Sequence, residues 1–212
     1  TKAGRDADGR QWRPLHRWNN RHYQNLYFGS GDTADEEALY VGTACHAFPA
    51  CHPVFTWLYR SKSGHPCKRE VLWEHGLDYK HGTGHGVGNI LNVHEGPQSF
   101  RWKLLPDAGK PAVFEEGMIT SDEPGIYLEN QYGIRIENEI LCRKGEENEY
   151  GQFMYFEDLT FVPIDLDGVE LSQMSELEKE RLNEYHAAVF EKLEPYFEGE
   201  ELTWLRPVTR AV

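Results

Sequence analysis

The chain has 212 residues, of which 39% are hydrophobic and 13% aromatic, and this length and composition predict a folded domain. Its net charge of −13 and pI near 5.2 argue against a surface that binds nucleic acid or anionic membrane, because the acidic excess would repel both. No apolar run approaches the roughly 18 residues of a membrane span, the N-terminus lacks a hydrophobic signal core, and the four cysteines form no CxxC pair, so we expect a cytoplasmic protein.

The N-terminal part of the chain shows little regular patterning. Residues 1 to 25 are polar, rich in arginine and aperiodic, so we expect irregular structure over residues 1 to 30. From Asp32 an acidic start followed by spaced apolar residues predicts a helix, because acidic side chains favour a helix N-terminus. Residues 49 to 66 lose this pattern.

The middle of the chain predicts one short helix and then extended structure. Residues 68 to 74 read as a helix that ends at Gly76, and the histidine- and glycine-rich segment after it should be a strand or an extended loop. Residues 113 to 120, 132 to 142 and 153 to 163 alternate well enough to predict strands.

The C-terminal part of the chain predicts a helix. Ser175 and Glu178 stand at the spacing of a capping box, in which each side chain bonds the other residue's backbone. Apolar residues then recur at helical spacing. They are Leu182, Tyr185, Val189 and Leu193.

Five residues in unusual contexts predict site chemistry. His81, His85 and His94 lie in HGTGHGVG and NVHEGP, which are too rich in glycine for a helix, and Glu123 and Glu137 follow in TSDEPG and GIRIEN. A single histidine of this kind is more often a hydrogen-bonded, partly buried side chain. Together, however, these residues supply the nitrogen and oxygen donors that a hard or borderline metal ion takes.

These motifs, with GLDY before them and LNEYH and ELTWL near the C-terminus, resemble the catalytic domain of the Xaa-Pro aminopeptidases (aminopeptidase P) from about Val71 onward. The resemblance implies an α+β, pita-bread (creatinase/aminopeptidase) fold, with residues 31 to 212 as a portion of the catalytic domain whose N-terminal part is incomplete. It also implies that a metal-activated water releases the N-terminal residue from peptides with proline second. Prolidase and methionine aminopeptidase share the ligand types, but the residue sequences HGTGHGVG and VHEGP favour aminopeptidase P.

The resemblance also assigns roles to the five residues. His85 would be the imidazole ligand of the metal, Glu123 a ligand that accepts the proton of the attacking water, and Glu137 a bridging carboxylate. His81 and His94 would be catalytic without binding metal, by donating hydrogen bonds to substrate carbonyls and to the developing oxyanion.

Arg135 stands two residues before Glu137, on the same face of the predicted strand, and would orient a ligand carboxylate. The implied cofactor is a pair of Mn²⁺ ions, with Co²⁺ and Zn²⁺ as alternatives. The implied partners are peptide substrates with proline second, and a homodimer is compatible with the family. Neither nucleic acid nor a membrane is an expected partner.

One departure from the family concerns its two further ligands, aspartates in an upstream segment resembling DSGGxYxDGTTDxTRT. Residues 10 to 25, RQWRPLHRWNNRHYQN, occupy that place here. If their codons are read one base later they can encode DSGGxYxDGTTDITRT, with the ligand aspartates at Arg10 and Arg21. Our hypothesis is that residues 1 to 30 contain an aberrant metal-binding segment, produced by a frameshifted or mispredicted translation.

Two alternatives stay open for this region. A remnant of an engineered protease site at residues 25 to 30 is a lesser explanation of the unusual sequence there. It is also open whether residues 48 to 65 are correctly translated.

Arginines in place of two aspartates remove anionic donors and repel divalent cations, so a stable dinuclear centre is not expected in this chain. The alternative function is therefore a catalytically inactive pita-bread protein that binds peptide or a protein partner, although the presence of all five site residues favours the enzyme.

Overall fold

The computed structural model describes residues 54–55, 69, 72–73, 75–90, 92–101, 113–130 and 132–212. The predictions for residues 1 to 30 and for the helix from Asp32 lie outside these residues. In the described part of the chain, no helix is long and apolar enough to cross a membrane.

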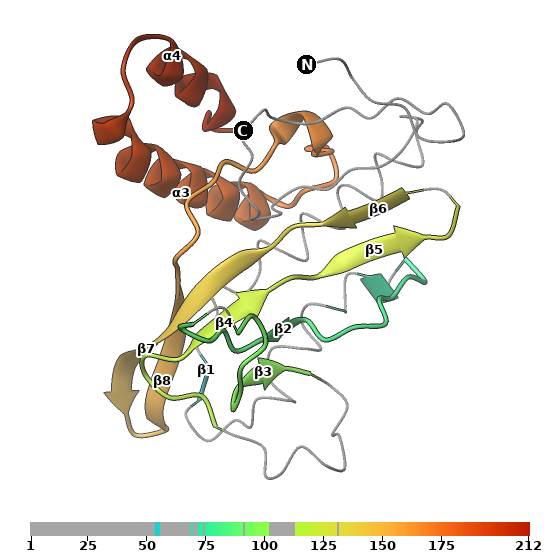
Figure 1. Ribbon diagram of the computed structural model, residues 1–212, viewed down its shortest axis with the longest axis vertical. Coiled ribbons are helices and arrows are strands. Elements are labelled where there is room, and N and C mark those ends of the chain that lie inside the picture. Colours follow the sequence, from blue (N-terminus) through green and yellow to red (C-terminus); the bar gives the residue numbers. More distant parts are fainter. Residues whose placement is uncertain are drawn as a thin grey trace.

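A four-stranded antiparallel sheet forms the centre of the described fold, in the order β1-β8-β7-β4, and two small two-stranded sheets, β2-β3 and β5-β6, accompany it. The helices lie at one end of the molecule, away from the turn that joins β7 and β8 (Figure 1). The strands are β1 (Val54–Phe55), β2 (Gly84–His85), β3 (Ser99–Phe100), β4 (Ile119–Asp122), β5 (Gly125–Leu128), β6 (Tyr132–Arg135), β7 (Asn138–Asn148) and β8 (Gly151–Asp158). The helices are η1 (Leu166–Gly168), α3 (Glu176–Leu193), η2 (Glu194–Tyr196) and α4 (Gly199–Val208).

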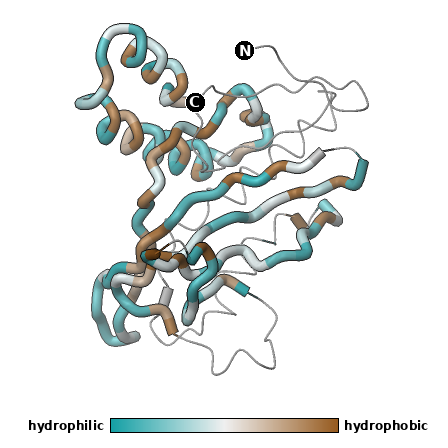
Figure 2. The backbone as a smooth tube through the Cα atoms, in the orientation of Figure 1, coloured by the Kyte–Doolittle hydropathy of each residue, from teal (hydrophilic) through white to brown (hydrophobic). Residues whose placement is uncertain are grey.

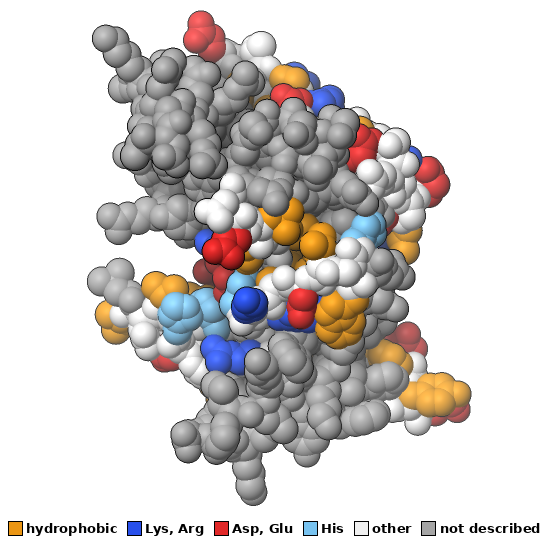
Figure 3. Space-filling model, turned by 90° about the vertical axis from the view of Figure 1, so that its right-hand side faces the viewer, with side chains coloured by type: hydrophobic (Ala, Val, Ile, Leu, Met, Phe, Trp, Pro, Cys, Tyr) orange, Lys and Arg blue, Asp and Glu red, His pale blue; other side chains and the backbone are white. Residues whose placement is uncertain are grey.

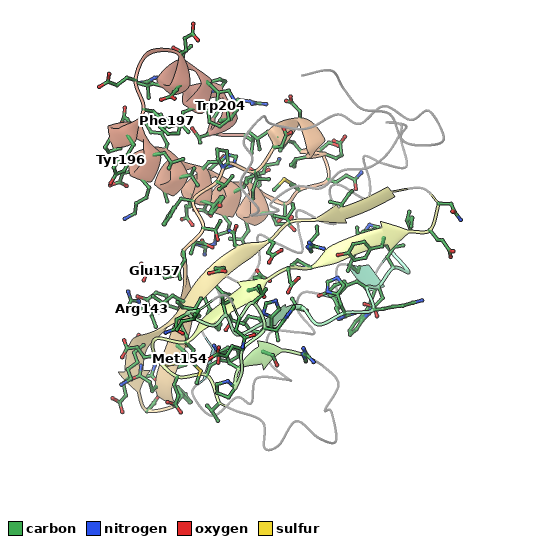
Figure 4. The ribbon with its side chains drawn as sticks, viewed as in Figure 1. Arg143, Met154, Glu157, Tyr196, Phe197 and Trp204 are labelled. Atoms are coloured by element: carbon green, nitrogen blue, oxygen red, sulfur yellow. The ribbon has the colours of Figure 1, made fainter. Side chains whose placement is uncertain are left out.

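Alternation along β7 and β8 buries one face of the central sheet. Met154 of β8 is buried, whereas Arg143 of β7 and Glu157 of β8 lie on the solvent side and point toward one another (Figure 4), with 2.7 Å between Nε and Oε2. An exposed ion pair of this kind adds little stability, so the apolar face is what holds the two strands in register. The buried cluster consists of Phe100, Phe114, Ile140, Cys142, Met154 and Phe156.

The three predicted strands exist, with different bounds. Residues 113 to 120 give only an isolated bridge at Val113 before β4, because a turn with Gly117 at φ +90° interrupts the extended chain. Residues 132 to 142 divide into β6 and β7, because β6 pairs with β5 whereas β7 pairs with β4 and β8. β8 begins at Gly151 and ends at Asp158, before the predicted end at Pro163, because its ladder with β7 ends at the pair of Ile140 and Asp158.

The C-terminal helix forms as predicted, with the complete capping box. The Ser175 N–H donates to Glu178 Oε2 at 2.7 Å, and the Glu178 N–H donates to Ser175 Oγ at 3.3 Å. Leu182 and Val189 are buried, and hydrophobic and hydrophilic stretches alternate along these helices (Figure 2). Leu182 belongs to a second cluster that joins α3 to the chain leaving the sheet, with Ile136, Ile164, Leu166 and Met174.

The end of the predicted helix 68 to 74 is confirmed. Leu72 and Trp73 are helical, and the helix closes with hydrogen bonds from Gly76 N to Trp73 O and from Leu77 N to Leu72 O. Gly76 has φ +68°, the left-handed conformation that glycine adopts most readily after a helix. The chain then runs extended into β2, as the sequence predicts.

Candidate active site

Strand β2 reaches the central sheet through β4. Gly86 forms a bridge with Thr120, and the Glu123 N–H donates to Thr83 O at 2.7 Å. Between these two contacts the backbones approach so closely that a Cβ on Gly84 would overlap the carbonyl of Ser121. The glycines of HGTGHGVG therefore allow the close approach that places His85 beside Glu123.

His85 and Glu123 face each other directly. The distance from His85 Nε2 to Glu123 Oε1 is 3.1 Å, and both side chains are largely buried. The hydrogen bond to Glu123 is the main cause that raises the pKa of His85. Burial by itself raises the pKa of Glu123, but hydrogen bonds and charge, chiefly from His85, lower it overall, so Glu123 is ionised at neutral pH.

The tautomer of His85 follows from its second ring nitrogen. His85 Nδ1 lies 3.1 Å from the carbonyl oxygen of Gly86, and a carbonyl can only accept, so Nδ1 carries a proton. Nε2 is left as the nitrogen that faces the carboxylate. An imidazole held in this way by a backbone carbonyl has the arrangement usual for a metal ligand.

Glu137 lies beside Glu123. Asp122 pairs with Asn138 in the β4–β7 ladder, so the residues just outside this pair, Glu123 and Glu137, stand next to each other. Burial, and then the negative charge of Glu123, raise the pKa of Glu137. Arg135 Nε lies 3.4 Å from Glu137 Oε2, so the guanidinium and this carboxylate are in contact.

His94 joins the pair from a closed loop. The Glu95 N–H donates to Gly86 O at 2.8 Å, and the Gly88 N–H donates to Asn92 O at 2.9 Å. These bonds fold the loop back, so that the His94 ring lies 4.2 Å from the His85 ring between centroids. His94 is exposed, which leaves it accessible to a ligand.

His81 is bound to Tyr127, a residue that was not among those predicted from the sequence. Tyr127 OH lies 3.0 Å from His81 Nε2, and Arg135 Nη1 donates to Tyr127 OH at 3.5 Å. Because His81 Nδ1 lies 2.6 Å from Gly82 O, Nδ1 carries the proton and Nε2 accepts from Tyr127. The hairpin register pairs Gly125 with Arg135 and Tyr127 with Gly133, so pairing β5 with β6 from sequence would have placed Tyr127 and Arg135 on one face.

The structure therefore brings His85, His94, Glu123 and Glu137 together, and connects Arg135 to both Glu137 and Tyr127. Histidine side chains gather beside acidic and basic ones on one face of the molecule (Figure 3). Within the described ranges, no three His, Cys, Asp or Glu side chains converge closely enough to hold a metal ion on their own. The residues fit a divalent ion by donor type, whereas the number of donors falls short.

Comparison with known proteins places the chain in a family. Residues 65–144 match metallopeptidase family M24, and residues 152–212 match the C-terminal region of peptidase M24. Aminopeptidase P2 of Arabidopsis thaliana is 48% identical over 146 residues, which are 67% of this chain and 20% of that protein. A probable Xaa-Pro aminopeptidase P of Pyrenophora tritici-repentis is 44% identical over 146 residues, 66% of this chain and 24% of that protein.

A solved structure is similar as well. The X-prolyl aminopeptidase from Caenorhabditis elegans, a cytosolic enzyme with a di-nuclear active site, superposes with a TM-score of 0.75 at 31% sequence identity, and covers 86% of this chain and 29% of that chain. The fold is thus a partial pita-bread domain. The chain spans about a fifth to a quarter of the length of the curated relatives that it matches. The two family matches together cover well over half of the chain, which belongs to metallopeptidase family M24 as a C-terminal portion of an aminopeptidase P.

Proposed function

We propose that this chain carries the C-terminal part of the active site of an Xaa-Pro aminopeptidase, which hydrolyses the N-terminal residue from peptides with proline second. The observation that carries the proposal is the largely buried pair of His85 Nε2 and Glu123 Oε1, 3.1 Å apart, with Glu137 and His94 beside it in a chain of family M24. A single ion pair would not indicate peptidase chemistry. A second carboxylate, Glu137, and a second imidazole, His94, beside the pair support it.

His85, Glu123 and Glu137 would hold the metal. A bound divalent ion supplies Lewis acidity, which lowers the pKa of water and polarises the scissile carbonyl. Glu123 is ionised, because its pKa is lowered overall, and can therefore accept a proton from the attacking water. Glu137 has a raised pKa next to Glu123, and a cation between two adjacent carboxylates would relieve their repulsion.

His94 and His81 would act on the substrate. His94 is exposed beside His85, where an N–H can donate to a peptide carbonyl or to the developing oxyanion. His81 Nδ1 donates a hydrogen bond to Gly82 O, and His81 Nε2 accepts one from the Tyr127 hydroxyl. The His81 ring is therefore held on both sides. Because both ring nitrogens of His81 are engaged, donation from Nε2 to a substrate carbonyl needs a proton on Nε2 and release of the Tyr127 hydroxyl.

The finer assignments follow the family resemblance. We propose two Mn²⁺ ions as the cofactor of the complete enzyme, with Co²⁺ and Zn²⁺ as alternatives, because carboxylate-rich sites suit Mn²⁺. Peptides with proline second are the proposed partners, a homodimer is the proposed assembly and the cytoplasm is the proposed location.

The lost aspartates favour a second function for the polypeptide as translated, an inactive pita-bread protein that binds peptide or a protein partner. Residues 10 to 25 contain arginines where the family has anionic ligands, and positive charge opposes binding of a divalent cation. We retain the proposal that this stretch is an aberrant translation of the metal-binding segment. Codons that cannot encode aspartate in the shifted frame at Arg10 and Arg21 would refute it.

The test compares two chains made from the same codons, one as given and one with residues 10 to 25 read in the shifted frame. Each is loaded with Mn²⁺, desalted, and assayed on an Xaa-Pro-Xaa peptide and on an Xaa-Pro dipeptide. The shifted-frame chain should retain two ions and cleave the longer peptide, whereas the chain as given should retain one ion weakly and show no turnover. Glu123→Gln in the shifted-frame chain is the control, and it should abolish turnover.

A shifted-frame chain that retains two ions but cleaves neither peptide would favour the inactive binding protein. Preference for the dipeptide would identify a prolidase instead.

A further inference from the structure

Ser121 is a buried serine that lies between the two residues of the central pair. It belongs to β4 and is 1% exposed. Its hydroxyl oxygen accepts a hydrogen bond from the His85 N–H at 3.0 Å and lies 3.1 Å from Glu123 Oε1. The same hydroxyl lies 3.4 Å from His85 O.

The hydroxyl has one proton and two candidate acceptors. Glu123 Oε1 is the nearer of the two and carries charge, and hydrogen bonds to ionised acceptors are the stronger ones. The Ser121 hydroxyl therefore donates its hydrogen bond to Glu123 Oε1. A lone pair of Ser121 Oγ accepts the hydrogen bond from the His85 N–H. Ser121 thus bonds the backbone of His85 and the side chain of Glu123 with a single atom.

The backbone pattern explains why a side chain is needed here. β2 and β4 meet at the Gly86–Thr120 bridge and at the hydrogen bond from Glu123 N to Thr83 O. The His85 N–H lies between these two contacts and donates to Ser121 Oγ in place of a strand carbonyl. A buried amide left without an acceptor would be destabilising, so this hydroxyl holds β2 against β4 at the point where His85 projects.

We propose that Ser121 is a positioning residue of the metal site, which fixes the Glu123 carboxylate relative to His85 through this bifunctional hydroxyl. The inference rests on the proposed function, since it treats His85 and Glu123 as ligands. Ser121 touches neither substrate nor metal in this role. Partners that orient metal ligands typically contribute about 10- to 100-fold in metal affinity.

The test uses the shifted-frame chain with Ser121→Ala, which removes the hydroxyl, and Ser121→Thr, which keeps it. Ser99→Ala is the matched control, because Ser99 pairs with His85 across the other edge of β2. Mn²⁺ affinity is measured by titration calorimetry, and thermal unfolding of each apo chain verifies folding. Ser121→Ala should weaken Mn²⁺ binding about 10- to 100-fold, whereas Ser121→Thr and Ser99→Ala should stay within about threefold of the parent.

A second readout does not depend on metal. The exchange rate of the His85 amide, followed by NMR in the apo chains, should rise about tenfold or more in Ser121→Ala and be restored in Ser121→Thr. A parent shifted-frame chain that binds no Mn²⁺ would contradict the proposed function. The exchange rate of the His85 amide would then show by itself whether Ser121 holds this amide. Unchanged Mn²⁺ affinity in Ser121→Ala, or an unchanged His85 exchange rate, would overturn the positioning role.

Discussion

At the scale of single residues, the site depends on hydrogen bonds that fix ring nitrogens. His81 and His85 each use Nδ1 toward the carbonyl oxygen of the next residue, and so each directs Nε2 into the site. The partner of Nε2 differs: His85 meets the carboxylate of Glu123, whereas His81 meets the hydroxyl of Tyr127. This difference assigns His85 to the charged centre and His81 to its periphery.

The coupling between His85 and Glu123 can be measured in the chain without metal. The hydrogen bond to Glu123 raises the pKa of His85, so Glu123→Gln should lower that pKa toward the ordinary value for histidine. An NMR titration of the His85 ring checks this. An unchanged pKa in Glu123→Gln would mean that the two side chains do not interact.

The same coupling has a defined sign in stability. A raised folded-state pKa means that the folded chain binds a proton more tightly than the unfolded chain does. The stabilisation is therefore present below the unfolded pKa of 6.5 and is lost as pH rises through the folded pKa. Glu123→Gln should remove this part of the pH dependence of the unfolding free energy.

At the scale of elements, local signals predicted the C-terminal helix and the helix end at Gly76, because both depend on contacts within a few residues. The strand bounds needed more information. Residues 132 to 142 alternate continuously, yet β6 pairs with β5 and β7 pairs with β4 and β8 in a different sheet, and alternation alone does not show which strand each half pairs with. Tyr127 was not predicted because the β5–β6 hairpin was not predicted, and its register is what places Tyr127 and Arg135 on one face.

The capping box of α3 predicts a measurable contribution to stability. Ser175→Ala removes the side-chain acceptor of the Glu178 N–H and should lower the free energy of unfolding by about 1 kcal/mol. Ser175→Thr keeps a hydroxyl and should cost less. Urea denaturation of both variants makes the comparison, and equal stability of Ser175→Ala and the parent chain would contradict the role of the cap.

At the scale of the whole molecule, a buried histidine of α3 binds the chain segment that follows β8. His186 is 1% exposed, and its Nε2 accepts the Ile164 N–H at 3.1 Å. Burial is the main cause that lowers the pKa of His186. Nothing in the sequence marked this residue as buried apart from its helical spacing from Leu182.

His186 makes stability depend on pH in the opposite direction from His85. Because its folded-state pKa is lowered, the unfolded chain binds the proton more tightly, and stability falls as pH drops below 6.5. The melting temperature of the parent chain should therefore fall between pH 7.5 and pH 5 by more than that of His186→Gln, which lacks the titrating ring. An equal fall in both chains would show that other groups cause the acid sensitivity.

The five site residues were predicted from their motifs, and the structure brings four of them together. The motifs could not predict the geometry, because they do not show that β2 lies against β4. Residues 10 to 25 lie outside the described residues, and whether they replace a metal-binding segment depends on their codons.

Mn²⁺ binding to the purified 212-residue chain, compared with binding to His85→Ala, shows directly whether the residues around His85 hold a metal ion. We expect at most one weakly held ion per chain, because His85, Glu123 and Glu137 supply fewer donors than a dinuclear centre needs. We also expect His85→Ala to bind Mn²⁺ at least about tenfold more weakly than the parent chain. Two tightly held ions, or binding that His85→Ala leaves unchanged, would contradict these expectations.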